Sequence, residues 1–163
     1  MGEGYSKEKS SSEHGSIYVQ TDKPFYYSGD IVTGSIFVNL HEPYPARFID
    51  IQVKGKEKTK IREVIHYTDE EGRPQQRTEK HKDDHKILYT RLPIAKFDSH
   101  EIPPGQYRYP FTFQLANDLP SSVILTEHMY SAKVNYSIKA ILEPVKHSDV
   151  KKMKYKQRLI VRE

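Results

Sequence analysis

Residues 103–123 read PPGQYRYPFTFQLANDLPSSV, and this stretch does most to decide the fold. Large apolar residues fill every second position between two proline-containing ends: Tyr107, Tyr109, Phe111, Phe113 and Leu115. Such alternation is typical of a strand that buries one face and exposes the other. Prolines cannot donate a backbone hydrogen bond to a sheet, so Pro103, Pro104 and Pro120 bracket the strand. The stretch therefore predicts a strand whose aromatic residues face a core.

The same period of two recurs along the chain, around residues 17–21, 32–40, 49–53, 134–142 and 153–161. Groups of Gly, Pro, Asp and Ser separate these segments, and no helical period of 3.6 residues persists. About seven short strands with regular turns are typical of two packed antiparallel sheets. We therefore predict an all-β, immunoglobulin-like antiparallel β-sandwich.

The length of 163 residues fits a single domain. Residues 1–15 hold only Met1 and Tyr5 as large apolar residues, which predicts a flexible N-terminal tail before a domain over residues 16–163. Residues 68–86, TDEEGRPQQRTEKHKDDHK, are nearly all polar. We expect a long polar loop over about residues 66–86, forming the mobile tip of a hairpin.

Composition narrows the classes of function without choosing one. The net charge is +4, with 26 Lys and Arg residues against 22 Asp and Glu residues. This excess is mild, so only the positions of the charges can indicate an anionic partner. The chain has no cysteine, no apolar N-terminal run and no apolar segment long enough to cross a bilayer. These features predict an intracellular, cytoplasmic domain.

Four blocks of sequence, in order along residues 16–163, resemble the N-terminal domain of arrestins. The first is the Pro-Pro-Gly-x-Tyr approach, aromatic strand and Leu-Pro-Ser-Ser exit of residues 103–123. The others are YSGDIVTG at residues 27–34, IDIQVKG at 49–55 and NYSIKAIL at 135–142. The resemblance is closest to the α-arrestins, or arrestin-domain-containing proteins, and implies a β-sandwich of the arrestin N-domain type.

The resemblance also implies a function. It implies a non-catalytic adaptor or scaffold domain that links membrane cargo, such as receptors or transporters, to endocytic, sorting or ubiquitination machinery. The implied partners are those membrane proteins together with trafficking or ubiquitin-ligase proteins. The location would be the cytoplasm, peripheral to the plasma membrane or endosomes.

Two departures from the arrestin pattern limit what is carried over. Arrestin-like proteins normally carry a second, related sandwich, so we expect this chain to be a single-domain relative or an excised fragment. The α-arrestins usually recruit ubiquitin ligases through Pro-Pro-x-Tyr motifs, whereas residues 103–107 have one residue too many and lead into a core strand. We map no phosphate-sensing lysine of the visual arrestins or β-arrestins onto this sequence.

A second resemblance leads to a different protein class. Residues 19–32, VQTDKPFYYSGDIV, also resemble the strand entry of macroglobulin domains in secreted protease inhibitors and complement proteins. It covers one segment and leaves residues 103–123 unexplained. The alternative function that it implies is a macroglobulin-like domain of a secreted protein.

Two stripes of basic residues are the candidate binding residues. Each stripe occupies alternate positions, so a continuous strand would align it on one face. The stripes are Lys54, Lys56, Lys58, Lys60 and Arg62, and Lys152, Lys154, Lys156 and Arg158. A solvated outer face that blunts an edge explains them most simply. An anion would relieve the repulsion between these basic residues. The candidate anions are an anionic phospholipid, an acidic leaflet and a phosphorylated tail. An alternative function is therefore a peripheral membrane module that binds anionic lipid.

Other motifs give weaker signals. Met1-Gly2-Glu3-Gly4-Tyr5-Ser6 fits the pattern for myristoylation of Gly2, although chance occurrence is the simpler explanation. Residues 81–85, HKDDH, lack the spacing of a structural zinc site, so we expect neither a metal nor another cofactor. No phosphate loop, nucleophile elbow or His-Glu-x-x-His motif is present, and no basic and aromatic platform indicates nucleic acid. We therefore expect no enzymatic activity.

Overall fold

The computed structural model describes residues 11–163, and its regular elements there are eleven β-strands. The strands are β1 (Ser11–Ser12), β2 (Gly15–Thr21), β3 (Tyr26–Tyr27), β4 (Ile31–Leu40), β5 (Ala46–Thr68), β6 (Pro74–Lys96), β7 (Gly105–Gln114), β8 (Val123–Glu127), β9 (Tyr130–Pro144), β10 (Met153–Leu159) and β11 (Val161–Arg162). No helix in this part of the chain has the length and apolarity that a transmembrane span requires.

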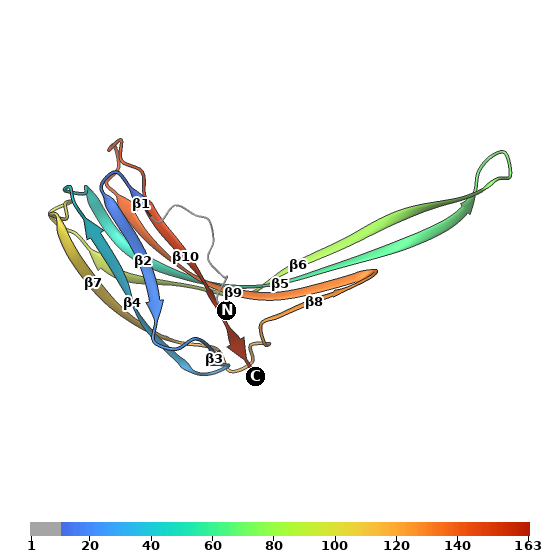
Figure 1. The fold of residues 1–163 in the computed structure, drawn as a ribbon, viewed down its shortest axis with the longest axis horizontal. Coiled ribbons are helices and arrows are strands. Elements are labelled where there is room, and N and C mark those ends of the chain that lie inside the picture. The colour runs from blue at the N-terminus through green and yellow to red at the C-terminus, as the bar shows by residue number, and fades with distance from the viewer. Residues whose placement is uncertain (1–10) are drawn as a thin grey trace.

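Two antiparallel sheets pack against each other as a sandwich (Figure 1). One sheet has the order β1-β2-β4-β7, and the other has the order β10-β9-β5-β6 with β8 paired to the exposed part of β9. The short strands β3 and β11 pair in parallel at one end of the sandwich. The antiparallel β-sandwich predicted from the alternation is thus confirmed.

The aromatic part of residues 103–123 forms β7 at the edge of the first sheet. Its aromatic residues face inward, and Phe111, which is 6% exposed, packs its ring against Gly34 of β4. Pro110 is tolerated because β7 pairs on one side only, with β4. Past the strand, Ser122 donates its backbone N–H to the Val161 carbonyl and accepts the Val161 N–H through its hydroxyl. The segment that follows β7 is therefore hydrogen-bonded to the C-terminal strand β11, and its role is to stabilise the fold.

The core lies between the two sheets and is built from alternate positions of the long strands. Its members are almost entirely aliphatic or aromatic, including Ile17, Val19, Val32, Ile36, Val38, Ile49, Ile51, Val53, Tyr136, Ile138, Leu142, Met153 and Leu159. Tyr44 is also fully buried, and its hydroxyl donates to the Lys151 carbonyl at 2.9 Å. The period of two in the sequence therefore identifies which face of each strand is inside.

The hairpin of β5 and β6 continues well beyond the sandwich, with the β8–β9 hairpin beside its first part (Figure 1). We call residues 56–86 of this hairpin the arm. The expected polar loop over residues 66–86 is wrong, because the strands reach Thr68 and resume at Pro74, leaving only a turn at 69–73. Asp69 closes that turn by accepting the backbone N–H groups of Glu71 and Arg73. Both faces of the arm are solvated, so its strands lack the apolar alternation that marks a half-buried strand.

The expected N-terminal tail also needs correction at its boundary. Ser11 and Ser12 pair with Ser16 and Gly15, so residues 11–15 already belong to the first sheet. His14 supports this arrangement, because its carbonyl accepts the backbone N–H of His41. Residues 1–10, with the myristoylation pattern at Gly2, lie outside the described residues.

Candidate anion-binding face

The strand register places both lysine stripes, except Lys152, on one face of the larger sheet. Ile49, Ile51 and Val53 of β5 point into the core, so Lys54 and every second residue as far as Arg62 point outward. On β10, Met153 and Leu159 are buried, so the residues at 154, 156 and 158 point to the same outer side. Lys152 is exposed and precedes the first residue of β10.

Neighbouring strands add further basic residues to this side, because directly opposed residues in an antiparallel sheet share a face. We call the whole set the outer cationic face: Lys54, Lys56, Lys58, Lys60 and Arg62 of β5, Lys80, Lys82 and Lys86 of β6, Lys133 and Lys139 of β9, and Lys154, Lys156 and Arg158 of β10. The sequence predicted each stripe separately. Only the register joins them.

Several directly opposed residues on this face carry the same charge. The like-charged pairs are Lys56 with Lys86, Lys58 with Lys133, Lys60 with Lys82, Arg62 with Lys80, and Lys139 with Lys156. Like charges directly opposite each other destabilise a sheet. A face that repeats an unfavourable arrangement five times is therefore a candidate for binding an anion.

Few carboxylates lie on this face to offset its charge. Among the described residues, no ion pair joins a carboxylate to any of Lys54, Lys56, Lys58, Lys60, Lys80, Lys82, Lys86, Lys133 and Lys156. Asp50 is on the same side, but it is 3% exposed and forms an ion pair with both Nε and Nη2 of Arg91. Its charge is already satisfied locally and does not neutralise the lysines.

The environment of Lys54 shows how close these charges are to one another. Burial, followed by the nearby ammonium groups, lowers the pKa of Lys54; those groups belong to Lys139, Lys56, Lys86 and Lys156. The Nζ atoms of Lys54 and Lys86 also lie 5.8 and 5.1 Å from the centre of the Tyr89 ring. Residues from four strands therefore act on one region of the face.

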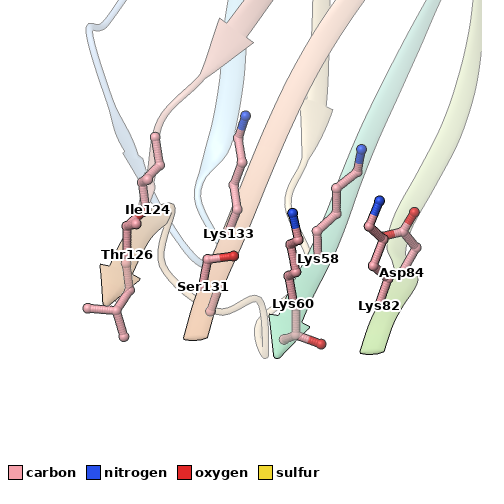
Figure 2. Close-up of a pocket in the computed structure, with 11 residues that line it drawn as sticks. Lys58, Lys60, Lys82, Asp84, Ile124, Thr126, Ser131 and Lys133 are labelled. Carbon is pink, nitrogen blue, oxygen red and sulfur yellow. The ribbon is translucent and has the colours of Figure 1, made fainter. Parts of the chain in front are cut away.

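A hollow of about 420 Å³ opens where the outer cationic face passes onto the arm. Lys58 and Lys60 line it from β5, Lys82 and Asp84 from β6, Ser131 and Lys133 from β9, and Ile124 and Thr126 from β8. In Figure 2 the four lysine side chains point to the same side of the strands. In the described part of the chain, the hollow thus collects four ammonium groups from three strands and one carboxylate, that of Asp84.

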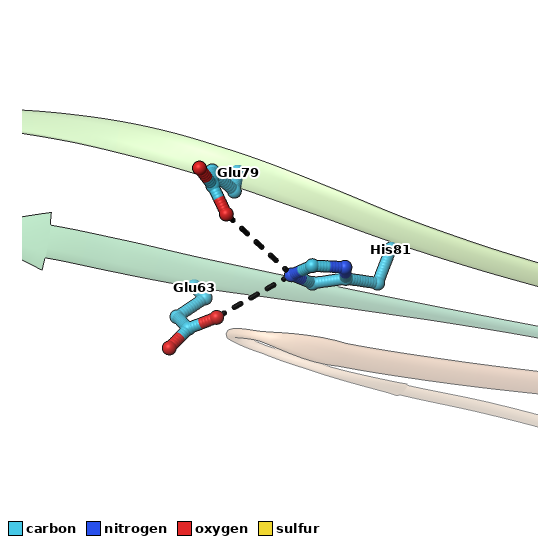
Figure 3. Close-up of side chains that lie close together, drawn as sticks. All are labelled: Glu63, Glu79 and His81. Atoms are coloured by element: carbon cyan, nitrogen blue, oxygen red, sulfur yellow. Dashed lines mark hydrogen bonds and ion pairs between the residues drawn. The ribbon is translucent and has the colours of Figure 1, made fainter.

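The opposite side of the arm carries acidic residues and histidines instead. His81 Nε2 lies 3.3 Å from an oxygen of Glu63 and 3.9 Å from an oxygen of Glu79 (Figure 3). The donor atoms of these three residues lie within 4.8 Å of one another; Glu63 and His81 are exposed and Glu79 is half-buried. The HKDDH pattern at residues 81–85 does not predict this group, because Glu63 comes close to His81 only through the pairing of β5 with β6. Three exposed donors fall short of the closed set of four that is typical of structural zinc.

The outer cationic face includes five lysines outside the two predicted stripes: Lys80, Lys82, Lys86, Lys133 and Lys139. The first three occupy alternate positions together with Asp84, which is the same signal that identified the stripes. The loop predicted for residues 66–86 would give this alternation no common face, so only the observed strand β6 makes it meaningful. Lys133 and Lys139 show no pattern of their own and join the face only through the pairing of β9 with β5 and β10.

Comparisons with known proteins agree with this fold. Residues 15–163 match the family described as arrestin (or S-antigen), N-terminal domain. The chain is 29% identical over 142 residues to arrestin domain-containing protein A of Dictyostelium discoideum, covering 83% of this chain and 24% of that protein. The chain thus spans about a quarter of the length of that relative.

A solved structure shows the same fold at lower sequence identity. The crystal structure of Spo0M, a sporulation control protein from Bacillus subtilis, superposes with a TM-score of 0.59 at 20% identity. The match covers 92% of this chain and 50% of Spo0M. The macroglobulin resemblance concerns residues 19–32 alone, whereas the arrestin match extends over residues 15–163. From this match and the sandwich topology, the chain belongs to the arrestin family and corresponds to its N-terminal domain.

Proposed function

We propose that this chain is an adaptor domain that links membrane cargo, such as receptors or transporters, to endocytic, sorting or ubiquitination machinery. Membership of the arrestin family, whose members are generally non-catalytic, supports this proposal. The name of the Dictyostelium relative, an arrestin domain-containing protein, agrees with the α-arrestin branch. The proposed location is the cytoplasm, at the surface of the plasma membrane or endosomes.

The single observation that carries the proposal is the continuity of the outer cationic face from β10 across β9 and β5 to the arm. In this role the face binds the anionic side of the contact, either a phosphorylated cargo tail or the acidic leaflet around the cargo. A surface with one sign of charge attracts an anionic partner over several ångströms and aligns it before contact. Within the sandwich, the opposite face of this sheet is buried in the core.

One observation favours a second candidate, a peripheral module that binds anionic lipid directly. Exposed apolar residues accompany the lysines: Ile124 is 60% exposed and Tyr89 is 48% exposed. Basic and apolar groups on one surface are typical of proteins that lie on membranes. This candidate requires lipid alone, whereas the adaptor requires cargo proteins.

An affinity capture from membrane extract tests the adaptor. The purified chain serves as bait at low and high salt, with and without phosphatase treatment of the extract. We expect integral membrane proteins to be recovered together with sorting or ubiquitin-ligase components, and the recovery to fall at high salt. A loss after phosphatase treatment would place the phosphate groups on the partner.

Matched variants separate the outer cationic face from general charge effects. Lys154→Glu with Lys156→Glu reverses two charges on that face, while Lys23→Glu with Lys146→Glu makes the same change in net charge at exposed turn positions. We expect the first pair to abolish capture and the second to retain it. Equal loss from both pairs, or retention of lipid vesicles alone, would contradict the adaptor.

A further inference from the structure

We propose that the hollow on the arm is a binding site for a ligand with clustered phosphate groups, either a polyphosphorylated lipid headgroup or a soluble polyphosphate. The site consists of Lys58, Lys60, Lys82 and Lys133 with the hydroxyls of Thr126 and Ser131. The proposal rests on the anionic contact proposed above and narrows it to one position and one ligand chemistry.

Two adjacent rows of opposed residues build the hollow. The first row crosses four strands as Ile124, Lys133, Lys58 and Asp84. The second row crosses the same strands as Thr126, Ser131, Lys60 and Lys82. Neighbouring strands lie about 4.8 Å apart, so each row brings its two ammonium groups onto directly adjacent strands.

Among the described residues that line the hollow, only Asp84, which lies opposite Lys58, offers the four lysines a compensating charge. Lys133 opposes Lys58, and Lys82 opposes Lys60, although like charges in such positions repel. The nearby charges of Arg62 and Lys80, followed by burial and the charge of Lys82, lower the pKa of Lys60. Within residues 11–163, no ion pair neutralises Lys58, Lys60, Lys82 or Lys133. A bound anion with several charges would remove this repulsion.

The shape and chemistry of the hollow favour clustered phosphates over a single small anion. Its volume of about 420 Å³ lies in the range of small-molecule sites, about 300–1,000 Å³. Lysine binds phosphate as a point charge with three donors, and the hydroxyls of Thr126 and Ser131 add donors in the second row. Four ammonium groups less one carboxylate leave more charge than one phosphate group neutralises. Exposed Ile124 at the rim can contact the lipid next to a headgroup.

Titration calorimetry with sodium tripolyphosphate, compared with orthophosphate at matched ionic strength, tests the site on the whole chain. We expect tripolyphosphate to bind and orthophosphate to bind far more weakly. Single changes of Lys58, Lys60, Lys82 or Lys133 to Gln should each weaken binding about fivefold, the effect expected of one basic residue. These side chains are on the surface, so circular dichroism and thermal unfolding should match the parent chain.

Asp84→Asn provides a test that misfolding cannot imitate. It removes the only carboxylate that lines the hollow within residues 11–163, so we expect it to strengthen tripolyphosphate binding. The control is Lys23→Gln with Lys146→Gln, at exposed turn positions outside the hollow, which should leave tripolyphosphate affinity within about twofold. Weaker binding by Asp84→Asn, or equal weakening by this control, would overturn the site.

Two vesicle types distinguish the sources of the ligand. One is phosphatidylcholine with phosphatidylinositol bisphosphate, and the other is phosphatidylcholine with phosphatidylserine at the same surface charge. If the bisphosphate vesicles bind more tightly than tripolyphosphate and are released by it, the site takes a lipid headgroup. If tripolyphosphate binds and neither vesicle does, the site takes a soluble polyphosphate. Equal binding of both vesicles that is unaffected by the Lys58 and Lys60 variants would overturn the proposal.

The same variants separate this site from the adaptor proposal. Loss of cargo capture on charge reversal of Lys154 and Lys156, with no tripolyphosphate binding by the parent chain, would leave the adaptor standing and remove the phosphate site. Tripolyphosphate binding without cargo capture would retain the site and remove the adaptor. A doubly phosphorylated peptide that binds when tripolyphosphate does not would also overturn the phosphate site, because the peptide backbone would then be required.

Discussion

The ring of Tyr136 lies directly against Gly55, at the point where β5 leaves the sandwich for the arm. A β-carbon at residue 55 would lie 2.6 Å from two carbons of that ring and 3.1 Å from Cβ of Leu88. The Tyr136 hydroxyl donates to the Pro120 carbonyl at 2.6 Å. Gly55 and Tyr136 lie at the end of the core, next to the register shift between Gly55 and Lys56. The outer cationic face extends beyond this pair onto the arm.

Gly55→Ala should therefore destabilise the domain. The new methyl group would overlap a fully buried ring, and overpacking of this kind costs about 1–3 kcal/mol. The free energy of unfolding from urea titration measures the effect. Lys58→Ala, three residues along the same strand and exposed, should change it by less than about 0.5 kcal/mol. Equal stability of Gly55→Ala and the parent chain would show that Tyr136 moves aside freely.

Tyr136 should also make the stability depend on alkaline pH. Burial, followed by the carboxylates of Glu163 and Glu57, raises the pKa of Tyr136 to about 12, from 10.0. Folding thus favours the neutral phenol, and this stabilisation is complete below about pH 10 and is lost as the pH rises toward about 12. We expect unfolding midpoints to fall over that range and to fall less steeply in Tyr136→Phe, which cannot ionise.

The remaining slope in Tyr136→Phe should come partly from Tyr44, because burial raises its pKa as well. At neutral pH, Tyr136→Phe should cost about 1 kcal/mol for the hydrogen bond to Pro120. Parallel curves for the parent chain and the variant between about pH 10 and about pH 12 would contradict this role for Tyr136.

Arg91→Gln should destabilise the domain because it leaves a buried carboxylate without its partner. The side chain of Asp50 is 5% exposed, whereas that of Arg91 is 53% exposed. Leaving the buried group unpaired should cost about 1–3 kcal/mol. Arg77→Gln breaks an exposed pair with Glu79 and should cost less than about 1 kcal/mol.

A double-mutant cycle with Asp50→Asn measures the coupling of this pair. We expect the double variant to be more stable than the sum of the single changes implies, since removing both charges leaves none unpaired. Additive effects of the two changes would mean that Arg91 does not stabilise the fold through Asp50.

The arm should be dispensable for folding. Residues 59–83 contain no buried residue, and replacing them with an Asn-Gly turn would join Lys58 to its opposed partner Asp84. We expect the shortened chain to unfold cooperatively with a stability within about 1 kcal/mol of the parent, because few buried contacts are lost. Tripolyphosphate binding should disappear, since Lys60 and Lys82 are removed. Loss of the folded core would show that the arm stabilises the sandwich.

Local pattern alone identifies the inside of each half-buried strand. Ile36, Phe111 and Ile138 lie in alternating segments, and each is buried, because a strand turns every second side chain to the same face. The blocks around Gly29, Gly34 and Pro120 were also sufficient to indicate the arrestin family, which the match over residues 15–163 confirms. The buried face of each strand and the family resemblance depend on residues close together in sequence, so both can be predicted without knowing the strand order.

The outer cationic face depends on contacts between distant segments. Lys58 meets Lys133 only because β5 pairs with β9, and Lys156 meets Lys139 only because β10 pairs with β9. The sequence of the arm predicts a loop instead of two strands, because a strand with two solvated faces carries no apolar alternation. Its register is set by backbone pairing and by the Asp69 turn, so the position of Lys82 in the hollow follows from tertiary structure alone.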